Sequence, residues 1–331
     1  MRSIVSSGLN KKDEEEVIMD KTLRPKKLDE IVGRENIKKK LKILIQAAKE
    51  RNEAVEHIIF YGPHGLGKTM FAHVIANEIG KKIYVTSGPA ITNKAEIASI
   101  LTNLEKFDVL FIDEIHRLRK EIEEFLYPAM EEYKLDLTIG KGPSAKVIRL
   151  DLAPFTLIGA TTRIGLLSGP LRDRFGVIQR LDFYSQEELK EIVLRASKKI
   201  EVKITESGAA EVAKRSRGTA RIALRLLRRV RDYSQVNGRE IIDLNTVKEA
   251  LTLNDIDEEG LDPLDRKLLT ILVKNFKGGP VGIETLSAAV AEDVETICDV
   301  YEPYLLQSGF IKRTPRGRVA TEKAFKYIGI I

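Results

Sequence analysis

Glycines, a lysine and a threonine near the start of the chain have the spacing of a phosphate-binding loop. The run GPHGLGKT fits the pattern GxxxxGK[ST]. In such a loop the glycines let backbone amides converge on phosphate oxygens, the lysine reaches the β- and γ-phosphates, and the hydroxyl binds Mg²⁺. The sequence therefore predicts an ATP or ADP site with Mg²⁺, and the alternative is a plain glycine turn. The expected contacts are Gly65, Gly67, Lys68 and Thr69.

Two further groups of polar residues stand where predicted strands end. In DVLFIDEIHRL an apolar strand ends at Asp113 and Glu114. We expect Asp113 to hold a magnesium-bound water and Glu114 to polarise the attacking water; the alternative is a solvated strand end or a helix cap. The strand in TLIGATTR ends at Thr161 and Thr162, either of which can sense the γ-phosphate or simply cap a helix.

Strands that alternate with helices position these groups, which indicates an α/β fold with a mostly parallel sheet covered on both faces. A helical pattern with a break at Gly33 precedes the first strand, HIIFYG. The further predictions are helices over 69–79 and 94–101 and strands over 82–86, 109–112 and 155–160.

The second half of the chain has a different pattern. Residues 186–252 predict helical segments only, and the acidic segment NDIDEEGLDPLD marks a domain boundary. Three helical patterns and two short strands around a TPRG turn then predict a winged helix. The expected divisions are a flexible leader (1–21), a large domain (22–182), a small helical domain (183–256) and a winged-helix domain (257–331).

Composition excludes several classes of protein. The 331 residues include one cysteine, Cys298, and four histidines, so an internal disulfide and a cysteine-cluster metal site are excluded. No stretch approaches the roughly 18 apolar residues that span a bilayer, so we expect a cytoplasmic protein without a membrane. The net charge of +6 suits a polyanionic partner, although a mildly basic enzyme has the same charge.

Segments in a fixed order resemble the RuvB family of AAA+ motors from residue 22 to the end. They are LRPKKLDEIVG, GPHGLGKT, FIDEIHRL, LIGATTR, LRDRFG, RGTARIALRLLRRVRD and GFIKRTPRGRVAT. The resemblance implies an AAA+ P-loop core, a small helical lid and a C-terminal winged helix. It also implies a homohexamer that pumps double-stranded DNA through Holliday junctions bound by RuvA, which RuvC then resolves.

The resemblance also implies roles for particular residues. Arg174 in LRDRFG would be an arginine finger inserted into the neighbouring subunit's site, and Arg221 in RGTARIA would be a second sensor of the γ-phosphate. The other arginines of that helix, among them Arg228, are expected on a solvated or intersubunit face. The remaining implied nucleotide contacts are Leu23, Arg24, Met70, Glu131, Glu132, Tyr133 and Tyr184.

Two partner surfaces follow from the same resemblance. A hairpin predicted over 135–152 would dock RuvA; the alternative is an edge hairpin packed on its own domain. Its candidate contacts are Leu137, Ile139 and Val147. Arginines flanking the wing turn would neutralise DNA phosphates without reading bases, unless the turn is only a solvated loop. These are Arg313, Arg316 and Arg318.

The chain departs from the family pattern at four positions. His64 and Ala220 replace prolines, Met70 replaces a threonine, and Val294 stands where an arginine is expected. We expect ATPase activity to be retained despite these departures, because Lys68 is intact. The alternative functions are a replication-initiator ATPase, a clamp-loader subunit and a nucleotide-switched binding protein without turnover.

Overall fold

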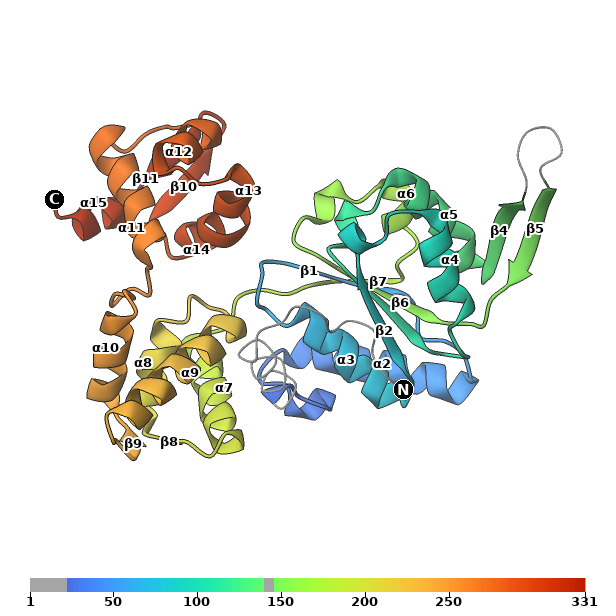
Figure 1. Ribbon diagram of the computed structural model, residues 1–331, viewed down its shortest axis with the longest axis horizontal. Helices are drawn as coiled ribbons and strands as arrows, with labels where there is room; N and C mark the ends of the chain where they lie inside the picture. Colours follow the sequence, from blue (N-terminus) through green and yellow to red (C-terminus); the bar gives the residue numbers. More distant parts are fainter. Residues whose placement is uncertain (1–22, 140–145, 331) are drawn as a thin grey trace.

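A computed structural model describes residues 23–139 and 146–330 (Figure 1). The leader expected over 1–21 and the tip of the predicted hairpin lie outside the described residues. The described chain forms a large domain, a helical lid and a C-terminal domain, in that order along the sequence.

A five-stranded parallel sheet forms the centre of the large domain, in the order β2-β3-β6-β1-β7. Tyr61 of β1 lies opposite Thr161 of β6, and Ile112 of β3 lies opposite Gly159. This register brings the carboxyl ends of three neighbouring strands to one edge. The strands are β1 (Ile58–Tyr61), β2 (Ile83–Ser87), β3 (Val109–Asp113), β6 (Thr156–Thr161) and β7 (Val177–Arg180).

Helices cover both faces of this sheet (Figure 1). Phe60 and Phe111 belong to one core, with α2 (Glu35–Arg51) and α3 (Lys68–Ile79). Ile59 and Leu110 belong to the other core, with α4 (Lys94–Thr102) and α5 (Lys120–Glu131). Burial on both faces explains why these strands are apolar without alternation. Short helices η1 (Leu28–Glu30), η2 (Gly88–Ala90), η3 (Ile115–Arg117), η5 (Ile164–Leu166) and α6 (Gly169–Arg172) complete the domain, with the hairpin β4 (Lys134–Ile139) and β5 (Lys146–Asp151).

The lid consists of four helices and one small parallel ladder. The helices are α7 (Gln186–Lys199), α8 (Glu206–Lys214), α9 (Ala220–Val236) and α10 (Leu244–Leu253). The ladder joins the two-residue strands β8 (Lys203–Ile204) and β9 (Ile241–Ile242), so the prediction of helices only is wrong here. Strands this short carry no measurable alternation, which is why the pattern did not indicate them.

The C-terminal domain has the winged-helix arrangement that the sequence predicts. Its first helix is α11 (Pro263–Thr270) with η6 (Ile271–Asn275), and its second is α12 (Ile283–Val290). Its third helix, named so below, runs through α13 (Val294–Thr296), η7 (Ile297–Tyr301) and α14 (Glu302–Gln307). The wing strands are β10 (Ile311–Thr314) and β11 (Gly317–Ala320), and α15 (Glu322–Ile328) closes the domain.

Arg318 is part of the interior of this domain. Its backbone pairs with Val281 on one side of β11 and with β10 on the other. Its guanidinium donates from Nε to Glu302 Oε1 at 2.8 Å and from Nη2 to Oε2 at 3.0 Å, and the residue is 7% exposed. The expectation that Arg318 contacts DNA is therefore corrected, because its charge is used inside the fold.

Replacing Arg318 with alanine should destabilise the winged-helix domain. The change leaves Glu302 as a buried carboxylate without its cation, which costs about 3–5 kcal/mol in comparable buried pairs. Calorimetric unfolding of the whole protein measures the loss. Arg316→Ala is the control, because Arg316 is exposed on the turn and should change stability by no more than about 0.5 kcal/mol. Equal melting temperatures for both variants would contradict this account.

Candidate functional site

The loop between β1 and α3 has the backbone geometry of a phosphate cradle. Gly65 and Gly67 have φ of 78° and 96°, a left-handed conformation that favours glycine. A Cβ on Gly65 would also lie 3.0 Å from the Cβ of Arg221, so the lid approaches the loop too closely for a side chain. The backbone N–H of Arg221 donates to the Gly65 carbonyl at 3.3 Å. The loop therefore faces the lid across a narrow gap.

Lys68 is buried at the start of α3, with 8% of its surface exposed. Its Nζ donates to the carbonyl oxygens of Gly62 at 2.7 Å and Pro63 at 2.8 Å. Burial lowers the pKa of Lys68 to about 8, although the nearby Asp113 acts in the opposite direction. A desolvated ammonium held in this way is suited to a polyanion, which would favour its charged form.

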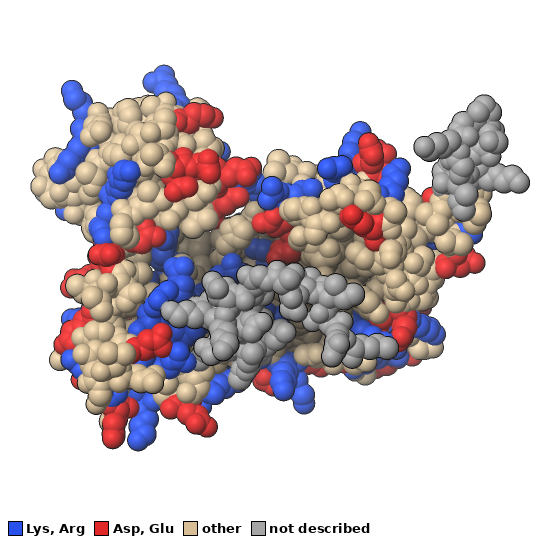
Figure 2. Space-filling view, in the orientation of Figure 1, with Lys and Arg blue, Asp and Glu red and all other residues tan. Residues whose placement is uncertain are grey.

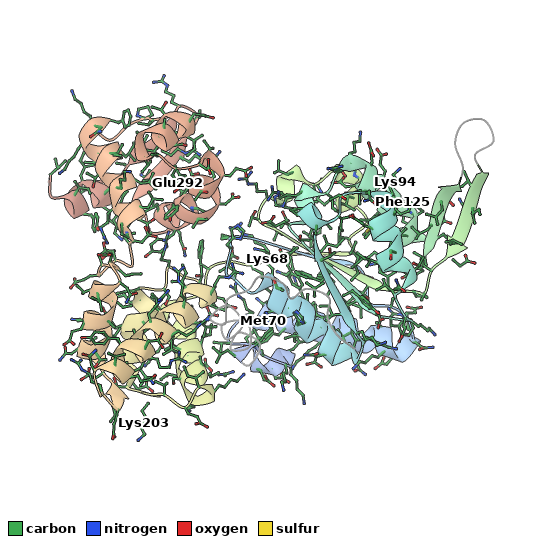
Figure 3. All side chains as sticks on the ribbon, viewed as in Figure 1. Lys68, Met70, Lys94, Phe125, Lys203 and Glu292 are labelled. Atoms are coloured by element: carbon green, nitrogen blue, oxygen red, sulfur yellow. The ribbon has the colours of Figure 1, made fainter. Side chains whose placement is uncertain are left out.

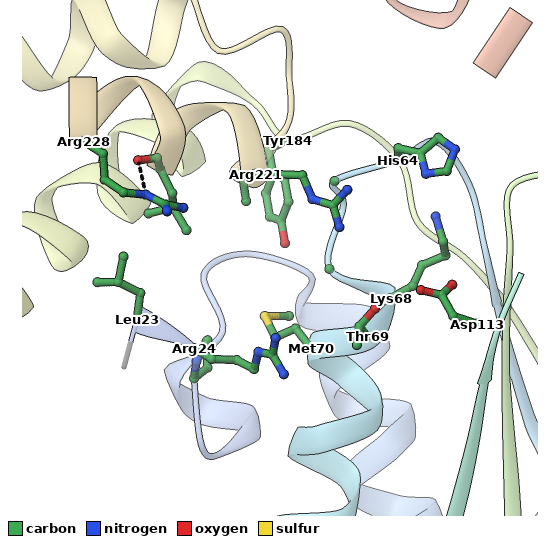
Figure 4. Close-up of a pocket in the computed structure, with 15 residues that line it drawn as sticks. Leu23, Arg24, His64, Lys68, Thr69, Met70, Asp113, Tyr184, Arg221 and Arg228 are labelled. Atoms are coloured by element: carbon green, nitrogen blue, oxygen red, sulfur yellow. Dashed lines mark hydrogen bonds between the residues drawn. The ribbon is translucent and has the colours of Figure 1, made fainter. Parts of the chain in front are cut away.

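Two adjoining cavities lie between this loop, the lid and the first described residues (Figure 4). One has a volume of about 190 Å³, and the Lys68 side chain lies in it between His64 and Asp113. The other has a volume of about 330 Å³ and a largely apolar lining that includes Ile31 and Ile192. Charged and apolar compartments side by side suit the phosphates and the base of one nucleotide. Residues that line both are Leu23, Pro25, Met70, Tyr184, Ala220 and Leu224.

The carboxyl ends of β3 and β6 place the predicted acids and threonines at the edge of the loop. Asp113 lines the smaller cavity, whereas Glu114 turns away with φ 47° and pairs with Arg117 at 3.3 Å. The Thr161 hydroxyl is buried and lies 2.9 Å from His116 Nδ1, and it accepts the Arg163 N–H at 3.0 Å. Thr162 is half-buried, and neither threonine is among the residues that line the two cavities.

Arg174 lies outside the lining of this chain's nucleotide cavities and has its own set of partners. Its Nη2 is 3.1 Å from Glu131, its Nη1 donates to the Pro170 carbonyl at 2.7 Å, and its guanidinium lies 4.1 Å from the centre of the Tyr127 ring. The Arg174 Nε is buried without a hydrogen-bond partner among the described residues. Glu131 therefore acts on Arg174 and not on a nucleotide bound by the same chain.

Glu132 and Tyr133 also lie away from the cavities. Glu132 is exposed and pairs with Lys134 at 3.3 Å. The Tyr133 ring meets Phe155 edge to face at 5.9 Å, and burial raises its pKa. Any contact between this segment and a nucleotide must therefore involve a second chain or a different conformation.

The lid supplies two arginines to the smaller cavity, Arg221 and Arg228 (Figure 4). The sequence analysis expected Arg228 on a solvated or intersubunit face; the structure adds that it is half-buried and lines this cavity. Arg221 and Arg228 are seven positions apart on α9, which is two helical turns, so they share a face. This spacing was the signal that the sequence offered.

Two residues beside the cavities, Arg34 and His116, were not predicted as part of the site. The Arg34 guanidinium lies 4.2 Å from the centre of the Tyr184 ring and donates to the Asp182 carbonyl. His116 contacts Thr161, and burial lowers the pKa of this histidine. Arg34 is far from Tyr184 in sequence and belongs to no motif, so only the fold reveals it.

Comparison with known proteins matches nearly all of the described chain. Family models match at residues 23–181 (Holliday junction DNA helicase RuvB P-loop domain), 184–257 (RuvB AAA lid domain) and 258–329 (RuvB C-terminal winged helix domain). The chain belongs to the RuvB family. The predicted resemblance, fold class and enzyme class are thereby confirmed: this is a nucleotide-binding P-loop ATPase of the RuvB branch migration type.

Relatives resemble it along nearly their full length. The Holliday junction branch migration complex subunit RuvB of Kosmotoga olearia is 58% identical over 97% of this chain and 94% of its own. That of Clostridium kluyveri is 59% identical over 92% of this chain and 87% of its own. The solved Thermotoga maritima RuvB Holliday junction branch migration motor is 50% identical, with a TM-score of 0.85 over 93% of this chain and 98% of that one.

The residues near Lys68 suit a magnesium nucleotide, as expected of a RuvB chain. Thr69 and Asp113 line the same cavity. The described residues hold no group of three or more histidines, cysteines or carboxylates that could bind a metal. Mg²⁺ usually keeps several waters and takes phosphate oxygens with one or two protein ligands, so one hydroxyl and one carboxylate fit it.

The RuvB hairpin extends from the large domain on the side away from the lid (Figure 1). Leu137 lies opposite Ile148, whereas Val147 lies opposite Thr138 and so points to the other face. Val147 is 66% exposed and Ile148 is 43% exposed. The structure thus adds Ile148 to the face of Leu137 and separates Val147 from it. Ile139 ends β4, but its side chain lies outside the described part.

Of the three wing arginines, Arg313 and Arg316 are exposed. Lys312, also exposed, is a third cation of the wing that the sequence analysis did not single out.

No helix in the described part of the chain is long and apolar enough to cross a membrane.

The affinity of this RuvB chain for ATP should fall as the pH rises above about 8. The free chain loses the Lys68 proton near that pH, whereas bound phosphate favours the ammonium, so binding at higher pH must take up a proton. Below pH 8 the lysine is already charged, so the affinity for ATP should not change with pH. Above it, each pH unit lowers the affinity by up to about tenfold.

Isothermal titration calorimetry in two buffers of different ionisation enthalpy measures this proton uptake. Lys68→Arg is the control, because a guanidinium stays charged throughout and should remove the pH dependence even where it weakens binding. A wild-type affinity that does not vary between about pH 7 and 9.5 would show that the Lys68 charge is not linked to binding.

Proposed function

We propose that this chain works in a homohexameric ring that hydrolyses ATP at its subunit interfaces and drives double-stranded DNA through Holliday junctions with RuvA. RuvC would then cut the junction. The observation that carries the proposal is the division of the catalytic groups. Lys68 and Asp113 line the chain's own cavity, whereas Arg174 is held at Glu131, outside it. Arg174 is absent from the lining of its own chain's cavity, and the proposal assigns it to the site of the neighbouring chain.

Each residue of the cavity has a distinct part in the proposed hydrolysis. The backbone of the loop and Lys68 bind the phosphates, while the apolar cavity beyond Leu23 and Tyr184 takes the base. Bound Mg²⁺, held through Thr69 and Asp113, would neutralise phosphate oxygens. Glu114 is paired with Arg117 of the same chain. Once this ion pair opens, Glu114 orients the attacking water.

The arginine finger must exchange one set of partners for another. In the single chain, Glu131 and the Tyr127 ring hold the Arg174 guanidinium, yet its Nε is buried without a hydrogen-bond partner in the part of the chain that the structure describes. A phosphate of the neighbouring subunit offers more negative charge than one half-exposed carboxylate does. Supplying the cation from the neighbour makes hydrolysis depend on ring contact.

The lid is proposed to detect the γ-phosphate from the other side. Arg221 and Arg228 reach the cavity from α9, and the Arg221 backbone is already bonded to Gly65. Loss of the γ-phosphate removes one anion from between these arginines and Lys68, so the mutual repulsion of the cations rises. The expected consequence is rotation of the lid away from the loop.

DNA and RuvA are proposed to bind at opposite ends of the chain. The exposed cations Lys312, Arg313 and Arg316 on the wing suit the backbone of a duplex of any sequence. The hairpin face with Leu137 and Ile148 suits an apolar surface of RuvA. A synthetic four-way junction tests the whole function: ATP and RuvA together should yield separated duplexes, and intact junctions with both present would refute it.

Arg174→Ala should abolish ATP hydrolysis while ATP binding stays within about twofold. Loss of such a finger lowers turnover by about 10³- to 10⁵-fold. Mixing this variant with Glu114→Gln, which is also inactive alone, should restore part of the turnover, because some interfaces then combine an intact Glu114 with an intact Arg174. Arg172→Ala, an exposed neighbour, serves as the control. Failure to recover activity at any mixing ratio would argue against action between subunits.

Arg313→Ala and Arg316→Ala should each weaken duplex binding equally for all sequences. Each lost phosphate contact should reduce the slope of log affinity against log salt by about 0.9. Lys203→Ala is the matched control, since Lys203 is an exposed cation at the far end of the lid (Figure 3). Fluorescence anisotropy over a salt series provides the measurement. Unchanged slopes for both wing variants would exclude the wing from the DNA interface.

A further inference from the structure

An ion pair joins the large domain to the third helix of the winged-helix domain. Arg163 directly follows Thr161 and Thr162. Its Nε donates to Asp299 Oδ1 at 3.0 Å, and its Nη2 lies 2.8 Å from Asp299 Oδ2. Its Nη1 is also 3.7 Å from Glu295. Two parallel hydrogen bonds from one guanidinium to one carboxylate fix both the distance between the two side chains and their relative orientation.

The backbone of Arg163 is tied to the edge of the sheet. Its N–H donates to the Thr161 hydroxyl at 3.0 Å, and that hydroxyl also contacts His116. A change in this edge therefore moves Arg163. Asp299 in turn borders a cavity of about 360 Å³ that His64 of the phosphate loop and Arg221 of the lid also line. The third helix thus lies beside the nucleotide site.

The surface of the third helix that faces the large domain is acidic. We call Glu295 and Asp299, whose carboxylates lie 3.7 Å and 2.8 Å from the Arg163 guanidinium, the acidic face. Figure 2 shows acidic side chains on this side of the winged-helix domain, with basic side chains opposite them on the large domain. Val294 lies within this segment, at the position where an arginine was expected. Carboxylates repel DNA phosphates, so the acidic face suits a cationic protein surface better than a duplex.

The lid and the winged-helix domain are joined much more firmly. Arg217, next to the loop that meets Gly65, contacts Asp265 at 2.9 Å, with 7% and 0% of the two side chains exposed. The Arg217 guanidinium also lies 4.9 Å from the centre of the Tyr304 ring. In contrast, the Arg163 and Asp299 side chains are 31% and 25% exposed. Rotation of the lid therefore carries the winged-helix domain with it and opens the weaker, solvated contact.

We propose that Arg163 is a positioning residue for DNA-coupled hydrolysis, and that it docks the acidic face against the edge of the sheet that bears Thr162. Docking transmits the state of the nucleotide to the DNA-binding domain, and the state of that domain to the nucleotide site. The inference rests on the proposed role of Thr162 in sensing the γ-phosphate. Docking itself is a property of the chain that can be measured without ATP or DNA.

Asp299→Asn tests the coupling, because it removes the charge and keeps the size of the side chain. Basal ATPase should stay within about twofold, while stimulation by duplex DNA should fall at least about threefold. Asp293→Asn is the matched control: Asp293 is an exposed carboxylate just before the third helix, outside the acidic face, and its side chain caps no helix. Equal stimulation in Asp299→Asn and wild type would overturn the proposal, as would a parallel loss of basal activity and melting temperature.

Charge exchange separates coupling from simple packing. Arg163→Asp alone should lose the stimulation, and Arg163→Asp with Asp299→Arg should regain a measurable part of it. A double variant no better than the single variant would count against the ion pair as the coupling element.

The distance between the domains tests docking even where no ATPase is found. In a Cys298→Ser background, spin labels at Ser99→Cys on α4 and Lys274→Cys on η6 report this distance, since both positions are exposed. The parent and Asp293→Asn should give a narrow distribution, and Asp299→Asn a broader one. A distribution unchanged by Asp299→Asn would refute docking. Absence of ATPase from wild type, with docking intact, would refute only the proposed function.

Discussion

The close approach of the lid to the phosphate loop is the constraint on which the rest of the structure depends. Gly65 is adjacent to Arg221, with no room for a side chain on the glycine. The backbone N–H of Arg221 donates a hydrogen bond to the Gly65 carbonyl. In the proposed mechanism, a nucleotide between them contacts two domains at once, so its charge would govern their relative position. Lys68, desolvated on one side, and Arg221, anchored on the other, make this region strongly positive, and a polyanion relieves that repulsion. Binding energy would thereby be converted into domain geometry.

In the proposed mechanism, arginines would distribute this motion, and burial distinguishes their parts. Arg318 and Arg217 are buried against carboxylates, so they join elements permanently. Arg174 and Arg163 are partly exposed, and each is held by a carboxylate that water can replace. Arg313 is exposed on the wing, available to a partner. One residue type thus provides rigid joints, exchangeable contacts and a binding surface, because desolvation raises the cost of separating a pair.

Much of the fold was predictable because both-face burial leaves a plain apolar pattern in β1, β3 and β6. The phosphate loop and Asp113 were predictable because their chemistry restricts residue type and spacing. Tertiary contacts left no such pattern: Arg318 resembles its exposed neighbour Arg316, and only the Glu302 carboxylate beneath it determines its place. The pairing of Glu131 with Arg174 was hidden for the same reason, since α5 and the segment after α6 meet only in the folded chain.

The strengths of these contacts suggest why the motor would use exposed ion pairs at its moving joints. A partly exposed pair contributes only about 0.2–1 kcal/mol, since water and salt screen it. Loss of one phosphate from between several cations changes the local energy by more than that, because the site is desolvated. The nucleotide can therefore open Arg163–Asp299 or recruit Arg174 without breaking the Arg217–Asp265 joint, where separation of a buried pair costs about 3–5 kcal/mol. In the proposed motor, the weak joints would move first, and the buried joint would carry that motion to the wing.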